Sequence, residues 1–263
     1  MNRLRPIAVL GLFLALFVGT GCDESQFSTV IVTAQVAKTL NPESNTVSVL
    51  VGTATIQNIF HNDWMKSPDP GDTSFWSNPF PASIDPMAGA DVRLNNDPVG
   101  QKVSGVYLGA ALDLHYLARY DLSIVTPAGK TITAHGFLPD SFSIVGPRDG
   151  DSLRIGTDTL RAVWTRSDSA ETYIVGINPA DTSSPALGWS DGMTDTTCIV
   201  PDAAFRDSFG VAVPGEYVFS IMAVNGGWNK SGLDLFLSGG NVDGASGTFG
   251  CAVYPRPVSI LTR

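Results

Sequence analysis

Apolar and polar residues alternate with a period of two along most of this chain, the pattern of strands that turn one face toward a core. The first two runs cover residues 27–40 and 47–59 and are rich in Val, Ile and Thr. Side chains branched at Cβ suit the pleated surface of a sheet. The first part of the chain is therefore predicted to form two long strands.

The strand pattern resumes at residues 88–97, which end in an Asn-Asn-Asp turn, and continues at 103–109. Residues 119–138 then contain two alternating runs separated by Pro-Ala-Gly at 127–129. Proline presets the φ angle of a turn and glycine accepts the conformations that other residues avoid. A hairpin is predicted here.

Between these runs, residues 60–87 have no periodicity. The segment contains five prolines, which remove the backbone donors that a sheet needs. A long loop is predicted.

The second half begins with Gly-Pro and a charged turn in residues 139–150, which we interpret as a seam between domains. Short strand-like runs follow at spacings typical of a sandwich. They cover residues 160–165, 171–177, 195–200 and 215–225. One short helix is predicted at 201–209, with Pro201 at its start.

Alternation also predicts core residues on both sides of the seam. In the hairpin they are Tyr120, Leu122 and Ile124. In the second half, Trp164 is predicted to meet a face of the opposing sheet formed by Tyr217, Phe219, Ile221 and Ala223.

The predicted fold class is all-β, with two immunoglobulin-like β-sandwich domains in series after a lipoprotein signal peptide. The first domain covers residues 27–140 and contains the loop 60–87. The second covers residues 141–263.

The N-terminus has the plan of an exported protein. Arg3 and Arg5 precede an uncharged run at residues 7–18, which suits a secretory signal and is short for a membrane span. Gly21 and Cys22 then resemble a lipobox, in which the cysteine is acylated and becomes the first mature residue. Gly19 departs from this motif, which usually has an aliphatic residue there, and an ordinary signal peptide cut near Gly21 is the alternative.

Lipidation of Cys22 predicts a signal peptide at 1–21, a short polar tether at 22–26 and attachment to a membrane of the bacterial cell envelope. Asp23 resembles the inner-membrane retention signal of enteric bacteria, a signal that other lineages need not read. The outer membrane, facing the periplasm or the surface, is the expected location.

The charge of the chain disfavours one class of partner. The formal net charge is −9, and loss of Arg3 and Arg5 with the leader would make it −11. No basic cluster is present to contact phosphates, so nucleic-acid binding is disfavoured. Aspartate supplies 21 of the 25 acidic residues and, with 27 glycines, marks turns.

Two cysteines remain besides Cys22. Export permits a disulfide between Cys198 and Cys251, and two separate buried thiols are the equal alternative.

No motif for catalysis, a cofactor or a metal ion is present. The three histidines, His61, His115 and His135, lie in separate segments, and neither a zinc motif nor a nucleophile elbow occurs. No catalytic residue, cofactor or metal ligand is therefore predicted. Two aspartates that meet in space could still serve a hydrolase, and this is the least favoured hypothesis.

The strongest candidate for a binding surface is the loop at 59–80. Exposed aromatic residues are common anchors in recognition, whereas the opposing interpretation is that these rings cover an open end of the sandwich. The candidate residues are His61, Asp63, Trp64, Phe75, Trp76 and Phe80. Calcium is a further possibility for aspartates of turns, namely Asp63, Asp69, Asp72, Asp149 and Asp151.

Several stretches resemble known β-sandwich modules. AGADVRL, GVY and YDLSIVTPAGKTITAHGFLP resemble the N-terminal module of a domain-of-unknown-function family of bacterial lipoproteins, often encoded with TonB-dependent receptors, and its strands look like the carboxypeptidase-regulatory-like fold. WTRSDSAETYIVGI and PGEYVFSIMAVN are similar to fibronectin type III strands, and GGNVDGASGTFGCAV resembles the glycine-rich ending of the same lipoproteins.

This resemblance implies an envelope lipoprotein without catalytic residues. The expected function is a non-enzymatic accessory protein in nutrient capture or receptor function, which binds an outer-membrane receptor or a glycan. A structural or adhesive surface module is the main alternative.

Overall fold

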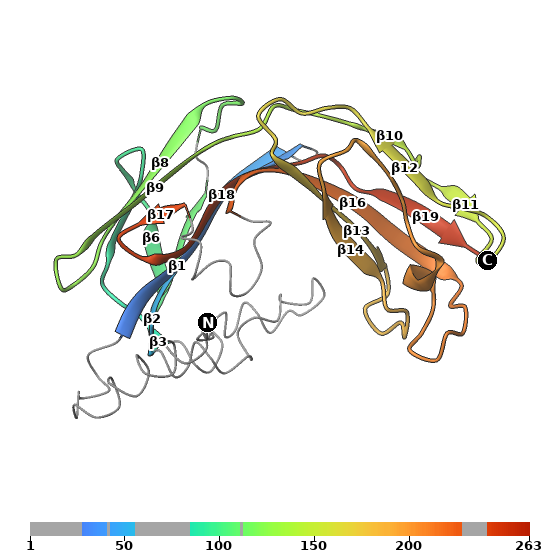
Figure 1. The fold of residues 1–263 in the computed structure, drawn as a ribbon, viewed down its shortest axis with the longest axis horizontal. Coiled ribbons are helices and arrows are strands. Elements are labelled where there is room, and N and C mark those ends of the chain that lie inside the picture. The colour runs from blue at the N-terminus through green and yellow to red at the C-terminus, as the bar shows by residue number, and fades with distance from the viewer. Residues whose placement is uncertain (1–27, 41–42, 56–84, 111–112, 228–240) are drawn as a thin grey trace, which may run out of the picture.

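The computed structural model describes residues 28–40, 43–55, 85–110, 113–227 and 241–263. Within these ranges the chain forms nineteen strands and one 3₁₀ turn. The prediction of an all-β sandwich fold is confirmed. The strands form two lobes that lean together like the sides of an arch (Figure 1).

Three sheets build these lobes. A large sheet of eleven strands extends through both lobes, a five-stranded sheet packs on it in the N-terminal lobe, and a three-stranded sheet packs on it in the C-terminal lobe. Figure 1 shows the two smaller sheets on the outside of the arch and the large sheet beneath them. The core lies between these layers.

In the N-terminal lobe, the large sheet begins with β1 and β2, which pair along their full length. Its strands here are β1 (Ser28–Leu40), β2 (Glu43–Thr55), β3 (Asp85–Pro86), β6 (Gly100–Val103) and β7 (Val106–Ala110). The covering sheet contains β4 (Asp91–Leu94), β5 (Asp97–Pro98), β8 (Arg119–Val125), β9 (Thr131–Phe137) and β17 (Val242–Asp243).

The predicted turns of this lobe are present. Asn95 and Asn96, between β4 and β5, both have positive φ angles, which asparagine tolerates better than most residues. β8 and β9 form the predicted hairpin. One boundary differs: β3, at the end of the expected loop 60–87, pairs with Gly52 and Thr53 of β2.

In the C-terminal lobe, β16 lies at the centre of the large sheet and pairs with β13, β18 and β19. The strands here are β11 (Asp151–Leu153), β13 (Thr172–Pro179), β14 (Trp189–Met193), β16 (Gly215–Gly226), β18 (Ser246–Tyr254) and β19 (Val258–Thr262). The covering sheet contains β10 (Ile144–Gly146), β12 (Arg161–Trp164) and β15 (Thr197–Ile199), and the predicted helix is a 3₁₀ turn, η4 (Asp202–Phe205).

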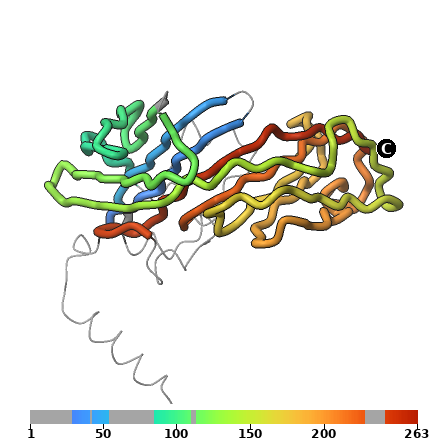
Figure 2. Tube along the Cα trace, turned by 90° about the horizontal axis from the view of Figure 1, so that it is seen from above, coloured from blue at the N-terminus to red at the C-terminus, as the bar shows by residue number. Residues whose placement is uncertain are grey.

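The predicted boundary at 140/141 implied two sandwiches that follow one another in the chain. The structure differs, because the N-terminal lobe also uses residues from the end of the chain. β18 pairs in parallel with β1 through nine residue pairs, from Ile31 opposite Ser246 to Thr39 opposite Tyr254. β17 pairs with β9 of the covering sheet. Residues 242–254 therefore complete the N-terminal lobe, and Figure 2 shows this red segment running from one lobe into the other.

The approach of β18 to β1 depends on Gly247. Its φ angle is +146°, and an added Cβ would lie 1.7 Å from the carbonyl oxygen of Val32. Only glycine can occupy this position without displacing one of the two strands.

The chain from β18 to β19 contains one residue more than the part of β16 that it faces. Ala223 and Phe219 of β16, four positions apart, pair with Val253 and Val258, which are five positions apart. The intervening Pro255 and Pro257 lack backbone donors, as expected where a ladder is interrupted. The core-facing residues are odd-numbered in β18, such as Val253, and even-numbered in β19, such as Ile260. Because of this one-residue bulge, both sets lie on the same face of the sheet.

The predicted core residues are buried. Tyr120, Leu122 and Ile124 are at most 4 % exposed. Trp164 packs edge to face on Tyr173 of the opposing sheet, with ring centroids 5.5 Å apart. The predicted face of β16 is also in the core, with Tyr217, Phe219, Ile221 and Ala223 all buried.

Tyr217 makes a hydrogen bond that is typical of immunoglobulin-like sandwiches. Its hydroxyl donates to the Val213 carbonyl, four residues upstream, at 2.7 Å. The ring packs edge to face on Phe205 of η4, with centroids 5.1 Å apart. One side chain thus fixes the corner that leads into β16.

We expect Tyr217→Phe to lower the free energy of unfolding by about 1–2 kcal/mol, because it leaves the Val213 carbonyl without this donor and keeps the ring. Urea denaturation measures the change. The control is Tyr116→Phe, because the Tyr116 hydroxyl has no hydrogen bond to a described residue. Equal effects of the two variants would contradict a special role for the Tyr217 corner.

Candidate functional site

Most of the predicted site residues fall outside the described part of the chain. Cys22 precedes it, and the whole candidate loop set lies within 56–84. This set comprises His61, Asp63, Trp64, Phe75, Trp76 and Phe80. The lipidation and loop hypotheses therefore stay predictions.

Cys198 and Cys251 do not form the disulfide that was one of the two alternatives. Both thiols are free: Cys198 lies half-buried in β15 of the three-stranded sheet, and Cys251 is buried in β18 of the large sheet. Burial raises the pKa of Cys251 to about 12 and also raises that of Cys198. These thiols behave as small core residues.

Two of the three histidines are in the described ranges. His115 lies in the connection before β8, with its Nε2 atom 3.1 Å from a carboxylate oxygen of Asp113, and both side chains are exposed. His135 lies in β9 with its side chain exposed.

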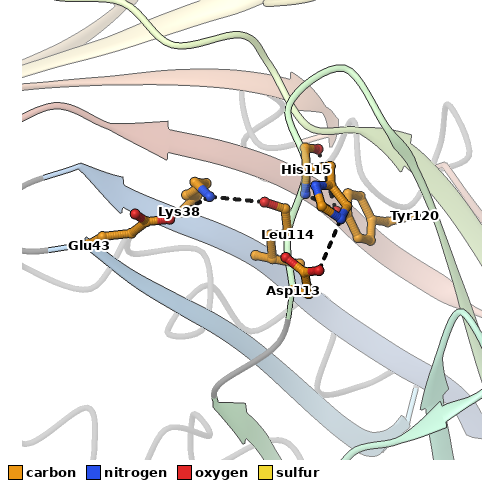
Figure 3. Close-up of polar contacts among 6 residues, drawn as sticks. All are labelled: Lys38, Glu43, Asp113, Leu114, His115 and Tyr120. Carbon is orange, nitrogen blue, oxygen red and sulfur yellow. Dashed lines mark hydrogen bonds and ion pairs between the residues drawn. The ribbon is translucent and has the colours of Figure 1, made fainter.

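The most unusual buried charge is Lys38, shown in Figure 3. It continues the core-facing positions of β1 after Val32, Ala34 and Val36, yet it is only 8 % exposed. Its ammonium group donates to the Leu114 carbonyl at 2.9 Å.

Lys38 has two further partners. Its Nζ lies 2.7 Å from a Glu43 carboxylate oxygen and 4.9 Å from the centroid of the Tyr116 ring. The hydrogen bond with Glu43 raises the pKa of Lys38, although burial acts in the opposite direction. The amine is therefore protonated and is not a nucleophile.

The Lys38 cluster, formed by Lys38, Glu43, Leu114 and Tyr116, connects the end of β1 to the start of β2 and to the segment before β8. Beside it, the Tyr120 hydroxyl accepts a hydrogen bond from the His115 backbone N–H at 2.7 Å, which ties the 113–118 connection to β8 (Figure 3). Each polar group in the cluster thus serves the connection between strands. We assign it a structural role.

A hollow in the surface, here called the junction hollow, lies where the two lobes meet. It has a volume of about 350 Å³. Its described lining comes from β9, from the residue before β13, from the end of β16 and from the segment before β17. These residues are His135, Gly136, Phe137, Glu171, Asn225, Gly226, Gly227 and Asn241.

Asn225 connects the lobes at this hollow. Its amide oxygen accepts from the Phe137 backbone N–H at 2.9 Å, and its amide nitrogen donates to the Ser169 carbonyl at 2.9 Å. The same nitrogen lies 3.3 Å from a Glu171 carboxylate oxygen. One side chain thereby joins β9 of the N-terminal lobe to the segment that precedes β13.

The remaining polar groups are also held in place. Glu171 accepts a second hydrogen bond from the Gly226 backbone N–H at 3.2 Å. Asn241 exchanges two hydrogen bonds with the backbone of Phe249. Gly226 has a φ angle of +109°, and a Cβ there would lie 2.5 Å from the Phe249 carbonyl oxygen.

Another hollow, of about 240 Å³, lies beside the interruption between β18 and β19. It is mainly apolar and is lined by residues that include Leu40, Phe142, Pro255 and Val258. Its charged residues, Asp149 and Arg256, form a long ion pair at 4.0 Å.

Within the described ranges, each hollow is lined by one acidic residue, Asp149 or Glu171, and not by the carboxylate pair that a hydrolase would need. In the described ranges, no three potential metal-binding side chains come together. Asp149 and Asp151, which were candidates for calcium, accept hydrogen bonds from the backbone of Ser259 and Arg148.

The comparisons with known proteins add no family. The sequence matches no protein-family model and no curated protein. Where the structure describes the chain, no helix is both long and apolar enough to cross a bilayer.

Sequence reasoning missed the junction hollow. Its polar residues, Glu171, Asn225 and Asn241, are single positions in unrelated segments, and no motif joins them. His135 was noted only as an isolated histidine. The one local signal is Asn-Gly-Gly at 225–227, which indicates a strand end with an unusual backbone.

Thiol labelling tests the state of the cysteines. In a Cys22→Ser variant at pH 8, we expect Cys251 to stay unlabelled in the native protein, because a pKa of about 12 leaves about one thiolate in ten thousand molecules. Unfolding without reductant should expose both remaining thiols, as mass spectrometry would show. Failure of both to react would indicate the disulfide.

We expect Asn225→Ala to lower the free energy of unfolding by about 1–3 kcal/mol, because it leaves the Phe137 N–H and the Ser169 carbonyl without a partner. Hydrogen exchange at Phe137 should also accelerate. Ser220→Ala, in the same strand, is the control because its hydroxyl has no hydrogen bond to a described residue. Unchanged exchange at Phe137 would contradict the role of Asn225 as a tie between lobes.

Proposed function

We propose that the protein is a non-enzymatic lipoprotein of the bacterial cell envelope, anchored through Cys22, which binds a partner with its β-sandwich lobes. The observation that carries this proposal is the N-terminal sequence. Arg3, Arg5, the apolar run at 7–18 and Gly21-Cys22 together fit a signal peptide that ends at an acylated cysteine.

Acylation would supply a firm anchor. Each buried methylene contributes about 0.8 kcal/mol, so several chains hold a protein at a membrane far better than one. Residues 22–26 would then connect the lipid to β1, which begins at Ser28. On this proposal the outer membrane is the expected location, with a receptor or a glycan as the partner.

The architecture supports a binding or accessory role. The C-terminal lobe fits a fibronectin type III-like module, since β10, β12 and β15 face a sheet that contains β13, β14, β16 and β19. The hydrogen bond from Tyr217 to Val213 agrees with this interpretation. The N-terminal lobe is proposed to be carboxypeptidase-regulatory-like. Such modules host many functions, so the fold alone does not name the partner.

A structural or adhesive role is the second candidate, and the continuous large sheet favours it. β18 pairs with β1 at nine positions and with the end of β16 at four, so backbone hydrogen bonds connect the lobes. A joint of this kind resists bending better than a linker would. The same rigidity would suit a spacer that holds other proteins away from the membrane.

Anchoring is tested by intact mass and membrane fractionation in a bacterial host. We expect the wild-type chain to begin at Cys22, to carry acyl mass and to sediment with membranes, whereas Cys22→Ser should lack that mass and enter the soluble fraction. Cys198→Ser is the matched control, because it removes a thiol and leaves the leader unchanged. A wild-type chain without acyl mass would overturn the proposal.

A further inference from the structure

The junction hollow has the size and position of a ligand site. Pockets for small ligands commonly enclose about 300–1,000 Å³ and occur between domains. We propose that the junction hollow binds a neutral pyranose sugar, which stacks on Phe137 and hydrogen-bonds to Glu171, His135 and Asn241. This inference rests on the proposed binding function and names its ligand class.

The polar groups of the hollow keep hydrogen-bonding capacity. Glu171 accepts two hydrogen bonds, and a carboxylate has about four acceptor sites. Asn241 uses one of its two amide hydrogens on the Phe249 carbonyl. The imidazole of His135 has no hydrogen bond to any residue that the structure describes. Acceptor and donor positions are both available to a ligand.

Phe137 supplies an apolar surface beside these groups. Its side chain is 41 % exposed. Because side chains alternate along a strand, Phe137 and His135 project from the same face of β9. A ring and an imidazole therefore line the hollow from one side, and Glu171 lines it from the other lobe.

This combination favours a neutral polyhydroxyl ligand. A hydroxyl donates and accepts, so it can bond to a carboxylate, an amide N–H and an imidazole. The C–H face of a pyranose can stack on the Phe137 ring. A purely apolar ligand would leave the polar groups without partners, which is costly.

Charged ligands fit less well. Among the residues that the structure describes, no lysine or arginine lines the hollow to balance the charge of an anion, and Glu171 would repel it. From the described part of the chain, a metal cation would find one carboxylate there, whereas hard cations need several oxygen ligands.

The site is also fixed before a ligand arrives. Asn225 bonds to Phe137 and Glu171, which are residues of the hollow from different lobes. Groups held in this way lose little freedom when a ligand binds. Asn225 is thus a positioning residue of the proposed site.

The test uses the full chain with Cys22→Ser, so that its result does not depend on anchoring. Glucose, galactose, mannose and N-acetylglucosamine are titrated separately into ¹⁵N-labelled protein, and amide shifts are followed by NMR. We expect at least one sugar to give saturable shifts at Phe137, Glu171 and Asn241, with a dissociation constant in the millimolar range.

Phe137→Ser should weaken that binding about tenfold, which corresponds to about 1.4 kcal/mol. The matched control is Phe209→Ser, the same change at a ring that is 89 % exposed and lies outside the hollow. Glu171→Gln should also weaken binding, whereas Glu216→Gln, remote from the hollow, should not.

The proposal is overturned if none of the four sugars shifts these amides, if the shifts map to other residues, or if Phe137→Ser binds as well as Phe209→Ser. None of these results affects the lipid anchor, which intact mass tests separately. Acylation without sugar binding would therefore reject this inference and leave the proposed function standing.

Discussion

The pairing of β18 with both β1 and β16 is the interaction on which the rest of the structure depends. One edge of β18 forms the parallel ladder with β1, and its other edge pairs with the end of β16. The N-terminal lobe therefore cannot complete its large sheet until the last part of the chain has been made. Contacts between residues so distant in sequence carry a high entropic cost of loop closure, and they usually slow folding.

β18 contributes to the large sheet in both lobes. The extra residue near Pro255 and Pro257 lets the strand that follows it, β19, keep its side chains directed at the core. Phe249, Cys251 and Val253 face the core before the interruption, and Ile260 faces it afterwards. In an uninterrupted strand Ile260 would point to the opposite face, because side chains alternate strictly. The bulge thus changes which residues face the core, from odd-numbered ones in β18 to even-numbered ones in β19. The neighbouring strand β16 keeps one alternation throughout.

Local pattern was sufficient for most strands and insufficient for their long-range pairing. The alternation at Tyr120, Leu122 and Ile124 and the turn at 127–129 depend on neighbours in sequence, and both predictions are confirmed. Residues 246–254 were interpreted only as a glycine-rich ending. Gly247 and Gly250 weaken the usual strand pattern, yet the glycine at 247 is required because β1 passes so closely. No pattern within the segment reveals that neighbour.

The same limit applies to the sites. Lys38 occupies a position that alternation assigns to the core, and its charge is compensated by Glu43 at the start of β2 and by the Leu114 carbonyl far along the chain. The junction hollow draws its lining from four separate segments. Chemistry that is assembled from single residues leaves no motif, so only the folded chain shows which of the many polar residues meet.

The rigid junction has a consequence for binding. If the lobes were joined by a flexible linker, the spacing between Phe137 and Glu171 would vary, and a ligand would have to fix it at an entropic cost. The β1–β18 ladder and the hydrogen bonds of Asn225 fix this spacing in the free protein. A binding surface at the junction and a stiff spacer are therefore compatible roles, because both follow from a sheet that continues through the two lobes.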